Sequence, residues 1–140
     1  MASFNKFQVF VENLAEKVHN LGADAIKIYL SNAAPSASGD SVKADMAEIT
    51  AQNGYPSGGT AITITSSAQS GGTYSLVGND VVFTASGGSF GPFQYAVLYN
   101  DTPTSPADPL IGWWDYGSAI SVNDGETFTV DFGSSILTLA

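Results

Sequence analysis

The sequence predicts a mainly β fold, an antiparallel β-sandwich or jelly-roll-like barrel with one N-terminal amphipathic helix. Three observations predict it. Short apolar and aromatic segments recur about every eight to twelve residues. Glycine, asparagine and proline clusters separate these segments, as turns require. Charged residues make up only 12% of the chain, and Ser, Thr, Asn and Gly supply most of its polarity, which suits the exposed face of a sheet.

At 140 residues the chain has the size of a single domain. We therefore expect one domain over residues 1–140, with a helical segment at 1–22 and a β domain at 23–140. A chain of this length buries about two-thirds of its unfolded surface, so it needs no disulfide to hold a core. It contains no cysteine.

The helix is predicted over residues 4–21. Apolar side chains recur there at helical spacing, at Phe7, Phe10, Val11, Leu14, Val18 and Leu21. Gly22 stands where a glycine ends a helix. A strand over Phe7–Val11 is the alternative, because Phe7, Val9 and Val11 also alternate.

The first strand is predicted at Ala25–Leu30, where Ile26, Ile28 and Leu30 share one face. Residues 46–50 fit either a short strand or one helical turn. A strand with strict alternation follows at Ala61–Thr65. The segments between them have loop or turn composition, namely 31–40, 53–59 and 67–72.

Two hairpins are predicted in the second half of the chain. One joins Thr73–Val77 to Val81–Ala85 through Gly78-Asn79-Asp80. The other joins Ile120–Val122 to Glu126–Phe132 through Asn123-Asp124-Gly125. In the last of these strands Phe128, Val130 and Phe132 share one face, and residues 136–139 form a final strand.

Two segments between the predicted hairpins are apolar on both faces. They are Phe93–Tyr99 and Leu110–Trp114, and a strand that is apolar on both faces belongs at the centre of a sheet. A proline-rich loop, Asn100–Pro109, joins them. We expect them to be central strands.

Charge excludes several classes of function. The net charge is −9, Arg is absent, and no base follows Lys43. Binding to nucleic acid requires cations that displace condensed counterions, so no nucleic-acid partner is expected. Anionic membranes are disfavoured for the same reason, no apolar run is long enough for a membrane span, and no signal peptide is recognisable.

The sequence offers little for catalysis, and we predict that the chain is not an enzyme and binds no cofactor or metal. His19 is the only histidine, and we interpret it as a surface or helix-end residue. Asp115 beside two tryptophans is the one place where glycan contact or hydrolysis is conceivable. The acidic turns at Asn100-Asp101 and Asn123–Glu126 either close tight turns or bind calcium.

Seven residues are predicted to contact a partner protein. The N-terminal phenylalanines form more apolar surface than a short exposed helix carries alone. Adjacent tryptophans in a strand point to opposite faces, so one of them faces solvent, a partner or a ligand. Prolines stiffen the loop that follows the first central segment. The predicted contacts are Phe4, Phe7, Phe10, Pro103, Pro106, Trp113 and Trp114.

The chain also resembles a family of small virion structural proteins of tailed bacteriophages. Three motifs carry the resemblance: Tyr95–Asp101, Pro109–Gly117 and Asn123–Phe132. The opening helix pattern with His19, and Lys27–Pro35, fit the same family. The resemblance covers nearly the full length.

The resemblance implies a repeated, non-enzymatic component of the virion that is made in the host cytoplasm. It points to a capsid decoration (cement) protein that forms homo-oligomers on the major capsid protein or another virion protein. A tail or fibre-associated protein, or a β module that binds host glycan, is the alternative. The family supplies no catalytic residues.

Overall fold

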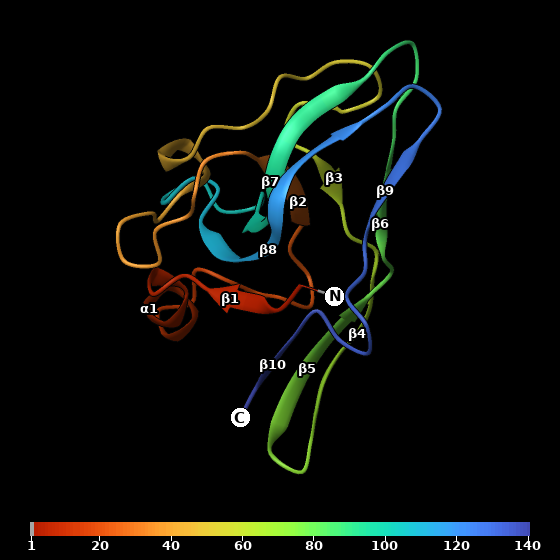
Figure 1. Cartoon of the computed structure of the whole chain (residues 1–140). Helices are drawn as coiled ribbons and strands as arrows, with labels where there is room; N and C mark the ends of the chain where they lie inside the picture. Colours follow the sequence, from red (N-terminus) through yellow and green to blue (C-terminus); the bar gives the residue numbers. More distant parts are fainter. Residues whose placement is uncertain (1) are drawn as a thin grey trace.

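A computed structural model describes residues 2–140 and confirms a mainly β fold built from antiparallel sheets with one short α-helix (Figure 1). The largest sheet has five strands in the order β1-β8-β7-β2-β3. Its strands are β1 (Phe4–Lys6), β2 (Ile26–Ser31), β3 (Thr60–Ala61), β7 (Phe90–Asn100) and β8 (Leu110–Val122). Every neighbouring pair in it is antiparallel.

Two smaller sheets complete the fold. One has three strands in the order β10-β5-β4, formed by β10 (Leu137–Leu139), β5 (Thr73–Gly78) and β4 (Ile64–Ser70). The other pairs β6 (Val81–Thr84) with β9 (Thr127–Val130). Over residues 2–140 the sheets pack in a sandwich-like way and do not close into a barrel.

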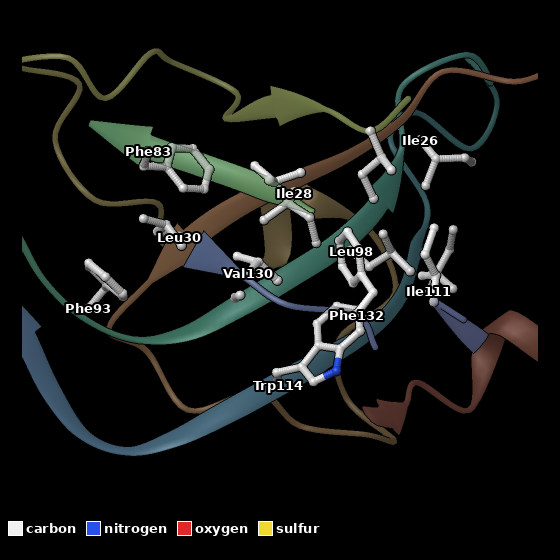
Figure 2. Packing of buried hydrophobic residues seen from close by; sticks show 14 of the residues in the cluster. Ile26, Ile28, Leu30, Phe83, Phe93, Leu98, Ile111, Trp114, Val130 and Phe132 are labelled. Carbon is white, nitrogen blue, oxygen red and sulfur yellow. The ribbon is translucent and has the colours of Figure 1, made fainter. Parts of the chain in front are cut away.

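The five-stranded sheet buries side chains on both of its faces. On one face β2, β7 and β8 pack against the two smaller sheets, where Ile28, Leu98 and Trp114 meet Phe83 and Val130 (Figure 2). A second cluster covers the opposite face, formed by Phe7, Tyr29, Met46, Val97, Tyr99 and Leu110. Burial on both faces explains why these strands are apolar throughout.

The central strands are as predicted. β7 lies between β2 and β8, and its alternate residues serve different clusters. Ala96 and Leu98 face the larger core, while Val97 and Tyr99 face the second cluster. β8 continues to Val122, well beyond the predicted Leu110–Trp114.

The N-terminal helix exists but is shorter than predicted. The α-helix α1 spans Val9–Ala15, and Lys17 then adopts a left-handed backbone with φ 67°. Residues 4–6 form strand β1 instead, because they pair with the edge of β8, with Phe4 opposite Trp114. The alternative strand at Phe7–Val11 is also wrong. Val11, predicted on the apolar face, is 52% exposed.

Neither predicted hairpin forms. β5 pairs with β4 and β10, while β6 pairs with β9, so the turn around Asn79 joins two different sheets. The Asn123–Glu126 turn does form, with the Glu126 N–H donating to the Asn123 carbonyl over 2.9 Å. It leads from β8 in the large sheet to β9 in the small one. A turn signal marks where the chain reverses, but it does not fix the partner of either strand.

Two further segments differ from the prediction. Residues 67–70, expected to be part of a break, belong to β4, which joins β5 through the two-residue turn Gly71-Gly72. Both glycines have positive φ, as this tight turn requires. Residues 46–50 are neither strand nor helix, and the helical turn lies just before them, at Lys43–Asp45. The last strand, β10, is as predicted.

Candidate functional site

The phenylalanines of the predicted contact surface lie mostly inside the chain. Phe7 and Phe10 are buried completely or almost so, at 0% and 1% exposure. Phe4 is half-buried and packs edge-on against Trp114, with ring centroids 5.4 Å apart. The apolar surface that motivated the prediction is therefore covered by this chain itself. The N-terminal segment belongs to the same sheet and cores as the rest of the protein.

The two tryptophans point to opposite faces of β8, as expected for neighbours in a strand. Trp114 is 4% exposed and contacts Phe132 in the larger core, with ring centroids 5.4 Å apart. Trp113 is half-buried and packs on Phe7 at 4.6 Å on the other side. Neither indole stands free on the surface, and Trp113 is the one that solvent reaches.

The proline-rich loop between β7 and β8 is held at its base and exposed at its tip. Lys27 makes an ion pair with Asp101 over 2.8 Å, and the Asp101 N–H donates to the carbonyl of Ala25. Pro106 lies in the exposed tip, whereas Pro103 is partly buried and lines a groove described below. The structure thus leaves Pro106 as the predicted contact most open to solvent.

Two carboxylates of this loop have altered proton affinities. The hydrogen bond from Lys27 holds the pKa of Asp101 below its usual range. Burial raises the pKa of Asp108, and the neighbouring Asp101 carboxylate raises it further. Asp108 also has a left-handed backbone, with φ 51°.

A polar cluster fastens the long loop before β3 to the large sheet. The Glu48 carboxylate accepts from Lys43 at 2.8 Å, from the Tyr55 hydroxyl at 2.7 Å and from the Gly58 N–H at 2.7 Å. The Tyr55 hydroxyl in turn accepts from the Leu30 N–H on β2. Burial opposes the ionisation of Glu48, but these three donors outweigh it and hold its pKa below the usual range.

The same cluster packs against two buried tyrosines. The Lys43 ammonium lies 4.9 Å from the centre of the Tyr29 ring, close enough for a cation–π contact. The Tyr99 hydroxyl donates to the Gly58 carbonyl at 2.6 Å. Next to it, Gly59 has φ 74°, and a Cβ there would lie 1.8 Å from the Ile28 carbonyl oxygen. Only glycine allows the loop to lie this close to β2.

His19 is buried, which corrects the interpretation of it as a surface or helix-end residue. It is 7% exposed and its ring packs against Phe10. Its Nδ1 lies 3.0 Å from Nδ2 of Asn100, which also donates to Asp24 at 2.7 Å. Nε2 of His19 is buried without a hydrogen-bond partner. Burial lowers the pKa of His19, and Asp24 opposes the shift only in part.

A groove of about 520 Å³ lies beside this junction. Residues 17–24, the β4–β5 hairpin and Pro103 form its walls, and Leu14, Tyr74 and Leu139 supply much of its apolar lining. Because Nε2 of His19 has almost no accessible surface, it offers no polar group to an occupant of the groove. The polar side of the groove lining is instead supplied by Lys17, Asn20, Asp24, Ser67 and Thr102.

Most carboxylates of the chain are used to hold backbone in place. Asp45 accepts from the N–H groups of Ser41 and Val42, and these bonds hold its pKa below the usual range. Turns elsewhere are closed in the same way by Asp24, Asp40, Asp115, Glu126 and Asp131. Asp80 and Asp124 instead accept from the N–H groups of residues distant in the sequence, Phe132 and Gly87. The acidic turns at residues 100–101 and 123–126 thus already have a structural use for their oxygens. In the described part of the chain, no group of three or more His, Asp and Glu side chains is placed to hold a metal ion.

Asp115 lies on the exposed part of β8. Its carboxylate accepts from Gln94 at 3.0 Å and from the Gly117 N–H at 2.8 Å, and these two bonds hold its pKa below the usual range. Both contacts belong to the sheet surface. Among residues 2–140, no helix is long and apolar enough to cross a membrane.

Comparisons of this chain with protein-family models, with curated proteins and with solved structures find no match.

Proposed function

We propose that this chain is a non-enzymatic structural subunit of a bacteriophage virion, a capsid decoration (cement) protein that assembles on the major capsid protein. The observation that carries the proposal is how the chain uses its charged side chains. Within residues 2–140, all side-chain carboxylates except Glu12, Glu16 and Asp108 accept a bond from a donor in the same chain. Groups used in this way stiffen turns and junctions, as a structural subunit needs.

The charge distribution suggests the kind of partner surface. Two of the four lysines, Lys27 and Lys43, are already paired with acids. Exposed acids lie on β8, in the turn to β9 and directly after β9, at Asp115, Asp124, Glu126 and Asp131. They have no base nearby in the sequence, because none follows Lys43. A surface of one sign steers association with a surface of the opposite sign. The partner on the particle is then basic.

Two measurements test the proposal. Mass spectrometry of purified particles should detect many copies of the chain per capsid, and a reconstruction of the particle should place its density on the capsid surface. Detection only in infected-cell lysate would refute it. Density on the tail would replace the capsid assignment with the tail or fibre alternative.

A binding experiment tests the partner surface separately. Purified chain is added to particles that lack it, and the bound fraction is measured at increasing NaCl concentration. Binding through the acidic surface should weaken as salt screens it. Binding that does not change with salt would contradict a basic partner surface.

The glycan-binding alternative depends on an exposed indole. Trp113 is the only candidate, and its packing on Phe7 leaves it half-buried. A glycan array with the unmodified chain and with Trp113→Ala decides this alternative. If the unmodified chain binds a glycan and a folded Trp113→Ala variant does not, the result would favour a glycan-binding module over a capsid decoration protein.

A further inference from the structure

The strand β4 is an open sheet edge. It pairs with β5 on one side, and over residues 2–140 no strand or loop makes backbone hydrogen bonds to its other side. The β4–β5 hairpin extends away from the body of the protein (Figure 1). Residues 65–70 are all exposed. Every second residue of such a strand therefore directs its N–H and C=O groups to solvent.

The other sheet edges are short or flanked by charge. β1, β3 and β10 have only two or three residues each. β6 and β9 have four, and acids lie directly beside them at Asp80, Glu126 and Asp131. Natural proteins block edge pairing with short strands and with charges. The outer side of β8 is also unpaired over residues 115–122, and the exposed Asp115 lies on that stretch. Among the edge strands β4 is the longest, with seven residues, and it has neither device.

Charge indicates what pairs with this edge. No charged residue occurs between Glu48 and Asp80, so the whole hairpin is neutral on a chain of net charge −9. A basic partner finds no acid on β4 to contact. Two copies that meet through the acidic surface formed by residues after Asp80 bring like charges together, but copies that meet at β4 do not. The neutral edge therefore suits a second copy of itself.

We propose that two copies of this chain associate by antiparallel pairing of β4 with β4 across a two-fold axis. A bulge between Ile64 and Ser66 ends the regular part of the strand, which is then Ser66–Ser70. For every residue of Ser66–Ser70 to have a partner in the second copy, the two-fold axis must pass through the central residue, Ala68. Ala68 then lies opposite Ala68 of the second copy, and Ser66 lies opposite Ser70.

The pairing joins two three-stranded sheets into one continuous sheet. It stands apart from the virion assignment, because it is a property of the purified chain. Five paired residues bury much less than the roughly 800 Å² per partner of a standard interface, so the dimer exchanges with the monomer. Many copies held on one surface would strengthen such a contact through their high effective concentration.

Disulfide trapping tests the pairing and its register. The chain has no cysteine, so Ala68→Cys introduces a single thiol. Opposite residues in antiparallel strands have Cα atoms about 4.5 to 5.5 Å apart, which a disulfide can span. Mild oxidation of Ala68→Cys should therefore give a covalent dimer on a non-reducing gel.

Ser66→Cys is the matched control, because it lies on the same face of the same strand. In the proposed register the two introduced thiols are four residues apart along the paired strands, about 13 Å, and cannot bond. Ser66→Cys mixed with Ser70→Cys should form the mixed dimer. No covalent dimer of Ala68→Cys, or equal yields from Ala68→Cys and Ser66→Cys alone, would overturn the proposal.

A charge variant tests the pairing without oxidation. Ala68→Lys places two lysines opposite each other, and Ala51→Lys makes the same change in the neutral stretch but away from the edge. Sedimentation velocity at rising concentration should show association for the unmodified chain and for Ala51→Lys, and none for Ala68→Lys. Association of Ala68→Lys equal to that of Ala51→Lys would overturn the proposal. Because purified chain is used, either result leaves the virion assignment to its own experiments.

Discussion

The side-chain amide of Asn100 donates a hydrogen bond to Nδ1 of His19 across 3.0 Å. The other hydrogen bonds of the Asn100 side chain show that Asn100 is the donor in this bond and Nδ1 the acceptor. The other amide hydrogen of Asn100 goes to Asp24, and its oxygen accepts from the Thr102 N–H at 3.1 Å. Nδ1 must therefore accept, and His19 is neutral with its proton on Nε2. Protonating Nδ1 would set two donors against each other beside the start of β2.

We predict that the fold loses stability as His19 becomes protonated. Its pKa in the folded chain is lowered from 6.5, so the unfolded chain binds this proton more readily. The stabilisation is complete above about pH 6.5 and is lost as the pH falls through the folded pKa, with a slope of at most about 1.4 kcal/mol per pH unit. Denaturant unfolding at a series of pH values between 7.5 and 5 measures it.

His19→Asn is the control for this pH dependence. Its side-chain oxygen replaces Nδ1 as an acceptor for Asn100 but does not titrate. The variant loses the packing of the ring on Phe10, so its absolute stability is lower. The decisive quantity is the slope of stability against pH. Equal slopes for His19→Asn and the unmodified chain would show that His19 is not the titrating group.

The Glu48 cluster should make a large contribution to stability. Glu48→Ala removes the acceptor of Lys43, Tyr55 and Gly58 together and leaves an ammonium and a hydroxyl in a largely buried site. We expect a loss of about 3 kcal/mol in the free energy of unfolding at pH 7. Glu16→Ala changes an exposed carboxylate and should cost within about 0.5 kcal/mol. Equal losses would contradict the structural use of Glu48.

The central strands can be predicted from the sequence because the apolar pattern that marks them lies within each segment itself. Phe93–Tyr99 is apolar apart from Gln94, and from Ala96 onward β7 is buried on both faces. The alternation at Phe128 to Phe132 likewise predicted β9. The partner of a strand cannot be predicted in this way, because it depends on segments that are distant in the sequence. The Asn123–Glu126 turn resembles a hairpin turn, yet β9 pairs with β6, because the side chains of β9 complete the core over β7 and β8.

The candidate site was harder to predict from the sequence. The predicted strand Ala61–Thr65 covers only the first two residues of β4, because residues 65–70 have no apolar alternation and the Gly71-Gly72 turn is the only signal for the rest. The Glu48 cluster joins residues that become neighbours only after the loop packs on β2. The interpretation of His19 as a surface residue is wrong because its hydrogen-bond partner, Asn100, lies 81 residues away in the sequence.

The N-terminal segment should behave as part of the core. Phe7→Ala removes a fully buried ring that packs on Trp113, and we expect a loss of about 3 to 5 kcal/mol in the free energy of unfolding. Val11→Ala, in the same segment but 52% exposed, should cost at most about 0.5 kcal/mol. If the segment were only a docking element, Phe7→Ala would leave the stability of the isolated chain unchanged.

Replacing either of two neighbouring carboxylates in the proline-rich loop with asparagine should change the stability of the fold, and the two changes should have opposite signs. Burial and the charge of Asp101 raise the pKa of Asp108, so the fold favours protonated Asp108 and its charge is unfavourable at pH 7. Asp108→Asn removes that charge, and asparagine tolerates the left-handed backbone at φ 51°. We expect a higher unfolding midpoint at pH 7, and a gain that disappears below the pKa of Asp108 in the unfolded chain.

Asp101→Asn is the matched comparison, and its effect on the unfolding midpoint at pH 7 should have the opposite sign. The hydrogen bond from Lys27 lowers the pKa of Asp101, so its charge stabilises the fold above its unfolded pKa, and that stabilisation is lost as the pH falls through the folded pKa. Asp101→Asn should therefore lower the midpoint at pH 7 and have little effect at low pH. Thermal or urea unfolding of both variants at pH 7 and pH 3 checks the pair. Shifts of the same sign at pH 7 would show that the charge of Asp108 does not oppose folding as proposed.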